Sequence, residues 1–326
     1  MHLYSAGPKR ALPAATVLAM PDLMLIKPTV AAGLSVLSRA IAPMLGACRG
    51  LLDAVVPQTC AACGIWLPGD RGLICGDCRR LIGAAAALAY CGRCGRTLPT
   101  AAIHPDGCAR CRSERHWNVA GVARVGSYES PLRSLLLGLK YRGHERNALC
   151  LAVCLADVLR RRGWLPELEA LVPVPMHWMR RVQRPCDHAA VLTMALSDQI
   201  GVPVFRLVRR IRHTPSQTSL VAKTARFDNV RGCFGLPRWY QPPWPKRDLQ
   251  GRTVCIVDNL MLTGATVHEV AKVLRKAGAR RIYAAVVARP AAPGDPPTVW
   301  PPPAELSESD LRTGPLVASA DTLGGA

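Results

Sequence analysis

From residue 119 onward, short apolar runs alternate with longer stretches in which apolar residues recur every three or four positions. The short runs are typical of buried strands, and the longer stretches have the spacing of one helix face. Predicted strands cover residues 122–128, 171–174, 253–257 and 281–288. Predicted helices cover residues 131–139, 145–162, 187–200 and 266–277. Strands that alternate with helices predict an α/β fold, with a parallel sheet flanked by helices.

The rest of the chain differs from this alternating block. Residues 1–56 are expected to form an N-terminal extension that is partly helical, because an amphipathic pattern over 31–56 is interrupted at Pro43. Residues 57–117 form a cysteine-rich module, and residues 118–289 form the α/β domain, with a Pro- and Trp-rich insertion at 237–249. Residues 290–326, rich in Pro, Ala and Ser, are expected to be a disordered tail.

Eight of the 14 cysteines form four CxxC pairs, and the pairs themselves come in two similar units. The pairs are Cys60/Cys63, Cys75/Cys78, Cys91/Cys94 and Cys108/Cys111. A CxxC turn brings two thiolates to one ion, and two such turns complete the tetrahedron that structural Zn²⁺ prefers. We therefore predict a double zinc ribbon with two structural zinc ions. Pairing in sequence order is favoured, and a crossed arrangement stays open.

A redox role is the alternative for these pairs, but four pairs at regular spacing favour structural zinc. Cys150 and Cys154, four apart on a predicted helix, are expected to be buried small apolar residues. Because disulfide scaffolds are short and secreted, the cysteines of this long chain indicate a reducing cytoplasm. No apolar run reaches the roughly 20 residues of a membrane span. An apolar stretch at 11–20 is interrupted at Pro13, so export is not expected.

Composition and charge narrow the choice of partner. The 326 residues are 49% hydrophobic, which excludes global disorder, and their formal net charge is +20. Residues 120–289 hold 28 basic and 11 acidic residues, whereas 290–326 hold one basic and five acidic residues. The positive charge therefore belongs to the α/β domain. It predicts an anionic partner there: a phosphorylated metabolite, nucleic acid or an acidic membrane surface.

The segment 253–266 combines features of a phosphate site. An apolar strand ends at Asp258, a short loop holds Thr263 and Gly264, and a helix begins near Thr266. The N–H groups and dipole of a helix N-terminus attract phosphate, and Gly allows its close approach. An acid at the carboxyl end of a parallel strand is placed to accept hydrogen bonds from sugar hydroxyls. An ordinary strand–loop–helix corner is the alternative.

This segment resembles the phosphoribosyl pyrophosphate (PRPP) motif of type I phosphoribosyltransferases. In that family two adjacent acids hold the ribose hydroxyls, and a Thr-Thr-Gly-x-Thr loop wraps the 5′-phosphate. Two positions differ here, with Asn259 in place of the second acid and Leu262 in place of the first Thr. The resemblance implies PRPP binding by Asp258, Asn259, Thr263, Gly264, Ala265 and Thr266. Mg²⁺ would accompany PRPP, and Asn is a poorer Mg²⁺ ligand than Asp.

Further stretches resemble the ComF (competence protein F, GntX-like) family. These stretches are residues 128–143, the Val-Pro-Val-Pro-x-His sequence at 172–177, residues 212–220 and residues 229–234. In that family an N-terminal double zinc ribbon precedes the phosphoribosyltransferase-like domain, and the resemblance covers residues 55–289. At 184–188 this chain has Arg-Pro-Cys-Asp-His, where the family usually shows Arg-Gly-Phe-Asn-Gln.

The resemblance also implies that residues 206–231 form a mobile flap over the site. This range holds seven basic residues against Asp228 alone. Arg212 from the flap, together with Lys140, is expected to bind the diphosphate of PRPP. A solvated basic face is the alternative.

Two functions follow from the resemblance. The first is transfer of ribosyl 5-phosphate from PRPP to an unidentified acceptor, which needs positioning and charge stabilisation rather than a side-chain nucleophile. The second is a non-catalytic accessory protein that binds single-stranded DNA or a nucleotide. ComF-like proteins are associated with DNA uptake and use in natural competence, beside a helicase-like ATPase. We expect a ComF-type protein that binds PRPP or a related phosphosugar. Whether it also catalyses the transfer stays open.

Overall fold

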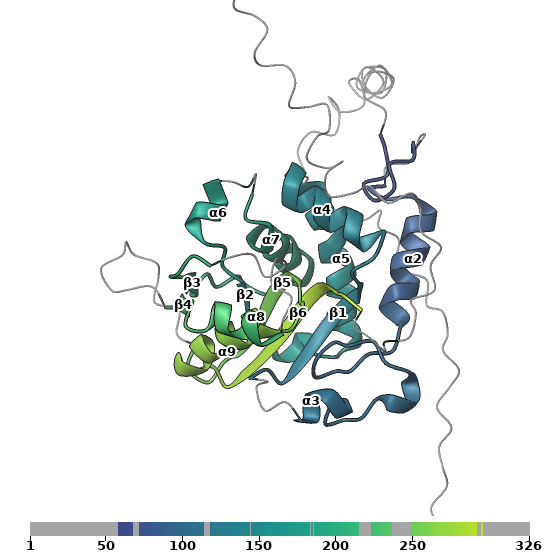
Figure 1. Ribbon diagram of the computed structural model, residues 1–326. Helices are drawn as coiled ribbons and strands as arrows, with labels where there is room; N and C mark the ends of the chain where they lie inside the picture. The colour runs from purple at the N-terminus through teal and green to yellow at the C-terminus, as the bar shows by residue number, and fades with distance from the viewer. Residues whose placement is uncertain are drawn as a thin grey trace, which may run out of the picture.

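A four-stranded parallel sheet lies at the centre of the computed structural model (Figure 1). The structure describes residues 58–67, 72–113, 118–143, 145–182, 184, 186–214, 223–236, 249–291 and 295. Along the sheet the strands are β1 (Gly121–Ser127), β6 (Arg281–Arg289), β5 (Thr253–Leu260) and β2 (Ala170–Pro173). The predicted α/β class and all four predicted strands are confirmed.

The four predicted helices are also confirmed, each to within three residues at either end. They are α4 (Leu132–Arg142), α5 (Glu145–Arg161), α7 (His188–Ile200) and α9 (Ala265–Lys276). Local signals explain the bounds of α7: the Asp187 side chain accepts a hydrogen bond from the Ala190 N–H, and Gly201 ends the helix with a φ of 72°. Among the described residues, no helix is long and apolar enough to cross a membrane.

The sheet is buried on both faces, as expected for a parallel sheet. Alternate residues of each strand enter two different apolar clusters. On β5, Cys255 and Val257 join the cluster that contains much of α5 and α7, whereas Val254 and Ile256 join the cluster that contains α9. Cys150 and Cys154 are fully buried in the first cluster, which confirms their predicted apolar role.

Four small elements lie outside the central sheet and its long helices. They are α6 (Trp178–Val182), β3 (Arg209–Arg210), α8 (Lys223–Val230) and β4 (Phe234–Gly235). Of these, β3 and α8 fall within the basic range 206–231. β3 and β4 form a separate antiparallel pair. The sequence pattern does not predict them, because two residues are too few to show the period of a strand.

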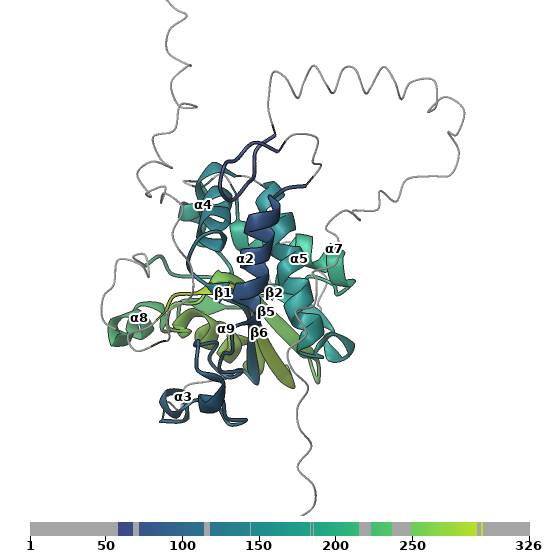
Figure 2. The same cartoon turned by 90° about the vertical axis from the view of Figure 1, so that its right-hand side faces the viewer.

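The cysteine module packs directly on the sheet rather than standing apart from it. Its helix α2 (Gly76–Ala87) lies along β1, the edge strand (Figure 2). A Cβ at Gly126 of β1 would lie 2.9 Å from the Ala85 Cβ, so the glycine permits this close approach. Ile82 of α2 is fully buried in the same apolar cluster as α5. The module also contains η1 (Thr100–Ala102) and α3 (Ala109–Ser113), and η2 (Leu165–Glu167) precedes β2.

Three sequence predictions fall largely outside the described residues. They concern the extension at 1–56, the insertion at 237–249 and the tail at 290–326. Within the last range, Asp295 is described, and it forms an ion pair with Arg96 of the cysteine module.

Candidate functional site

A cavity of about 190 Å³ opens at the carboxyl edge of the sheet. Open α/β sheets bind their ligands at this edge. The cavity is lined by the ends of β5 and β2, the beginnings of α7 and α9, and parts of α4 and β3. Seven of the eight predicted substrate residues line it: Asp258, Asn259, Thr263, Gly264, Ala265, Thr266 and Lys140.

The loop between β5 and α9, residues 261–264, is called the phosphate loop below. It ends at Gly264, which has a φ of 84° and precedes the first residue of α9. Only glycine adopts this conformation at low cost, and it leaves the first turn of α9 facing the cavity without a side-chain cap. The Thr263 hydroxyl lies 3.4 Å from the Ala265 N–H, which donates to it. Such N–H groups at the start of a helix are of the kind that binds anions in proteins.

Among the described residues, three Lys or Arg side chains from other elements line the cavity. They are Lys140 at the end of α4, Arg184 before α7, and Arg210 on β3. The Tyr141 ring orders two of them, with the Lys140 ammonium 4.8 Å and the Arg184 guanidinium 4.7 Å from its centre. These charges suit a polyphosphate rather than a single phosphate.

Arg212 is the one predicted substrate residue that does not line the cavity. Its guanidinium donates to the Arg231 carbonyl at 3.0 Å and to the Cys233 sulfur at 3.3 Å, so it ties β3 to the segment before β4. Arg210, two residues earlier on the chain, lines the cavity instead and donates to the Thr214 hydroxyl at 2.5 Å. Arg212 lies beyond the end of β3 (Arg209–Arg210), where the chain turns toward the segment before β4, and a charge count does not detect this difference.

Asp258 is a carboxyl group in an unfavourable environment for its charge. Burial raises its pKa to about 7, and nearby Asp187 adds to this effect. Hydrogen bonds from the backbone N–H groups of Asn259 and Leu260, together with the charge of Arg210, act in the opposite direction. Asp258 is therefore poised near neutral pH to accept or donate a hydrogen bond.

Asn259, at the position of the second acid, is 6% exposed and directed at α7. Its side-chain nitrogen lies 2.9 Å from Nδ1 of His188, and its side-chain oxygen is buried without a hydrogen-bond partner. Asp258 is thus the one carboxylate among the described residues that line the cavity. Mg²⁺ prefers several oxygen ligands and is repelled by nearby cations. One carboxylate among several basic side chains therefore does not fit a magnesium ion held by the protein alone.

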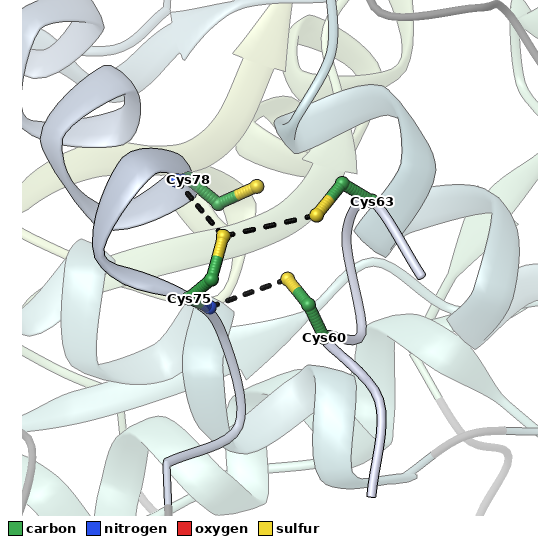
Figure 3. Close-up of side chains that lie close together, drawn as sticks. All are labelled: Cys60, Cys63, Cys75 and Cys78. Carbon is green, nitrogen blue, oxygen red and sulfur yellow. Dashed lines mark hydrogen bonds between the residues drawn. The ribbon is translucent and has the colours of Figure 1, made fainter. Parts of the chain in front are cut away.

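The eight CxxC cysteines form two clusters in sequence order: Cys60, Cys63, Cys75 and Cys78, and Cys91, Cys94, Cys108 and Cys111. The crossed arrangement is thereby excluded. Four sulfurs at about 2.3 Å from a tetrahedral zinc lie about 3.8 Å from one another. The measured separations are 3.7 Å between Cys63 and Cys75 and 3.8 Å between Cys94 and Cys108. Both clusters therefore fit structural zinc (Figure 3 shows the first).

Each cluster already favours one thiolate. A hydrogen bond from the Cys78 thiol lowers the pKa of Cys60 to about 4, and a hydrogen bond from the Cys94 thiol lowers the pKa of Cys91 to about 4. Backbone N–H groups add to both effects, including those of Cys75 and Cys108. Zinc binding removes the remaining thiol protons.

The two clusters differ in burial. All four cysteines of the second cluster are 1–4% exposed, whereas Cys63 of the first cluster is exposed and Cys75 is half-buried. We predict that a strong chelator removes zinc in two phases of about one ion each, because solvent reaches the first cluster more easily. The release is measured with a zinc-sensitive dye. Cys63→Ser should abolish the fast phase and spare the slow one, and loss of both phases together would contradict this prediction.

The pKa of Asp258 predicts how stability changes with pH. Between its ordinary value of 3.8 and about 7, the folded protein retains a proton that the unfolded chain loses. The carboxyl therefore lowers the free energy of unfolding as the pH rises through this range. Asp258→Asn removes this cost and should stabilise the protein by on the order of 2–4 kcal/mol at pH 8. Denaturant unfolding at pH 8 and pH 5 tests this: the gain must shrink at pH 5, and a gain independent of pH would rule out burial of charge as its cause.

Comparisons with known proteins match both parts of the chain. A double zinc ribbon domain matches residues 51–112, and a phosphoribosyl transferase domain matches residues 185–301. Competence protein F of Haemophilus influenzae is 30% identical over 221 residues, which cover 66% of this chain and 90% of that protein. The DNA utilization protein YhgH of Escherichia coli K12 is 30% identical over 232 residues, which cover 70% of this chain and 95% of that protein.

Among solved structures, a purine phosphoribosyltransferase from Pyrococcus horikoshii is similar over 46% of this chain and 91% of its own, with 15% identity and a TM-score of 0.24. The two relatives found by sequence share a higher identity with this chain, and the match covers at least 90% of each of them. The chain therefore belongs to the family of competence protein F and the DNA utilization protein YhgH, with a phosphoribosyltransferase domain behind an N-terminal double zinc ribbon.

Proposed function

We propose that the cavity binds PRPP or a related phosphosugar. The observation that carries this proposal is the convergence of the phosphate loop, Asp258 and three cations from separate elements on one cavity at the ligand edge of the sheet. In this proposal the first turn of α9 holds the 5′-phosphate, with the hydroxyls of Thr263 and Thr266. Asp258 holds the ribose hydroxyls.

Lys140, Arg184 and Arg210 would hold the diphosphate of PRPP. Arg guanidinium groups bind phosphate oxygens in pairs, and the ring of Tyr141 already orients two of these cations. Mg²⁺ would enter with PRPP as its counter-ion, because the residues lining the cavity offer it one carboxylate. The side chains then supply most of the positive charge that the ligand requires.

The chemistry that this arrangement supports is transfer of ribosyl 5-phosphate to an unidentified acceptor. The bond between the ribose C1 and a diphosphate oxygen breaks, diphosphate leaves with both bonding electrons, and the acceptor forms a new bond to C1. The three cations stabilise the negative charge on the departing diphosphate. The names of the relatives suggest that such a reaction serves DNA uptake or use in the cell.

Calorimetric titration with PRPP and Mg²⁺ tests the binding proposal. Asp258→Ala should weaken binding by about tenfold or more, because a charged hydrogen bond contributes about 1.5–3 kcal/mol. Arg210→Ala should have a similar effect, and Arg212→Ala is the matched control and should change affinity by less than about threefold. Absence of binding to the unmodified protein, or equal effects of the two arginine variants, would refute the assignment.

Binding of single-stranded DNA is a second candidate, and the surface of α6 favours it. Trp178 is 67% exposed and its ring lies 5.8 Å from that of His177, which in turn lies 5.1 Å from the ring of His213 after β3. Arg181 is exposed on the same helix. Exposed aromatic rings among cations bind single strands, because bases stack on the rings while the cations contact phosphates.

A filter-binding titration with single-stranded DNA over a range of salt concentrations tests this second candidate. Affinity should fall steeply with salt, since phosphate contacts release counterions. Trp178→Ala should weaken binding by about fivefold or more, because base stacking contributes on the order of 1–3 kcal/mol. Trp66→Ala is the matched control, because Trp66 is 60% exposed on the zinc module. A flat salt dependence, or equal losses in both variants, would exclude a DNA surface on α6.

A further inference from the structure

The second zinc cluster lies against the phosphate loop. Gly95 follows the zinc-ligating Cys94 and has a φ of 73°. A Cβ at Gly95 would lie 3.3 Å from Cε of Met261 and 3.1 Å from Cγ1 of Val122. The turn at residues 92–96, called the zinc turn below, therefore approaches both side chains closely. Met261 is the first residue of the phosphate loop, lines the cavity and is 2% exposed. The turn of the second cysteine cluster and the phosphate loop are therefore in direct contact.

The end of β6 forms a second link between the same two parts. Arg289 donates a hydrogen bond to the carbonyl of Cys94. The neighbouring Ala288 accepts a hydrogen bond of 3.0 Å from the N–H of Met261. A zinc ligand and the start of the phosphate loop are thus attached to adjacent residues of one buried strand, so a shift of either is transmitted to the other.

The zinc turn is also fixed to the edge of the sheet. The carbonyl of Gly92 accepts a hydrogen bond of 2.7 Å from the N–H of Val122 on β1. Arg124 of β1 is 1% exposed and donates to the hydroxyl of Thr97, just beyond the turn, at 2.8 Å. The turn therefore has one well-defined position on the sheet, from which it supports Met261.

The first zinc cluster has no comparable position among the described contacts. Cys60 and Cys78 pack in the apolar cluster that contains much of α5, whereas Met261 belongs to the cluster on the other face of the sheet. The two metal centres therefore differ in what they support, and the first serves as an internal control for the second.

We propose that the second zinc cluster positions the phosphate loop through Gly95 and Met261, so that zinc at this cluster and a phosphosugar in the cavity stabilise each other. This inference rests on the proposed function, because it concerns the same cavity. The coupling is reciprocal by linkage: if zinc raises the affinity for the ligand, then the ligand raises the affinity for zinc by the same factor. Gly95 and Met261 act as positioning residues and need not touch the ligand's reacting atoms.

The test measures zinc release from the intact protein with a strong chelator and a zinc-sensitive dye, with and without saturating PRPP and Mg²⁺. PRPP should slow release from the second cluster by about fivefold or more, the lower end of typical coupling between sites. Release from the first cluster, identified with Cys63→Ser, should change by less than about twofold. A calorimetric titration of the same sample shows independently whether PRPP binds.

Variants of Met261 connect this effect to the contact. Met261→Ala leaves a gap beside Gly95 and should reduce the PRPP effect on the second cluster to less than about twofold. Met261→Leu refills the space with a side chain of similar volume and should restore the effect. Met179→Ala on α6 is the control for loss of a methionine elsewhere. A merely structural role of Met261 would change the release rate equally with and without PRPP.

The outcomes separate this inference from the proposed function. If PRPP does not bind by calorimetry, the proposed function fails. If PRPP binds but release from the second cluster is unchanged, or if both clusters are slowed equally, the coupling is refuted while the proposed function stands. Slowing confined to the second cluster, lost in Met261→Ala and restored in Met261→Leu, supports it.

Discussion

The structure depends on how the free edge of β1 is covered. An uncovered edge strand exposes unpaired N–H and C=O groups and invites association with other chains. Here the zinc module covers it, through the hydrogen bond from Val122 to Gly92 and the packing of α2 along the strand. Besides its cysteines, the described part of the small module buries only four apolar residues: Ala62, Leu67, Ile74 and Ile82. Zinc therefore fixes its turns while the sheet supplies the core. The module and the α/β domain are therefore one packed unit in the part of the chain that the structure describes.

The same sheet produces the cavity. Parallel strands end at one edge, so Asp258, the residues after β2 and the start of α9 meet there. The electrostatics are unbalanced, with three cations, one carboxyl group of raised pKa and the N-terminal end of a helix around the cavity. A polyanionic ligand corrects this imbalance. Among the described residues, three basic side chains of this strongly positive chain thus lie where the proposed polyphosphate would bind.

Sequence reasoning predicts the elements whose signals are local. The four strands and four long helices are visible in the spacing of apolar residues along the chain. The CxxC spacing identifies the ligands of both zinc clusters, and it favours their pairing in sequence order. The phosphate loop is contiguous, so its residues are recognised as a motif. The sequence does not identify Arg184 and Arg210 as cavity cations. Their positions depend on how β3 pairs with β4 and on the path of the chain before α7. The contact of Gly95 with Met261 joins segments far apart in the chain, and it carries no sequence signal at all.

In the proposed complex, the first turn of α9 holds the phosphate of the ligand while the zinc turn supports the phosphate loop. Hydrogen exchange of backbone amides, followed by mass spectrometry with and without PRPP, tests this most directly. PRPP should slow exchange in the peptide spanning residues 262–267 and in the zinc turn at 92–96, with little change at α6. Slowed exchange at α6 alone, with no change in 262–267 at saturating PRPP, would contradict it.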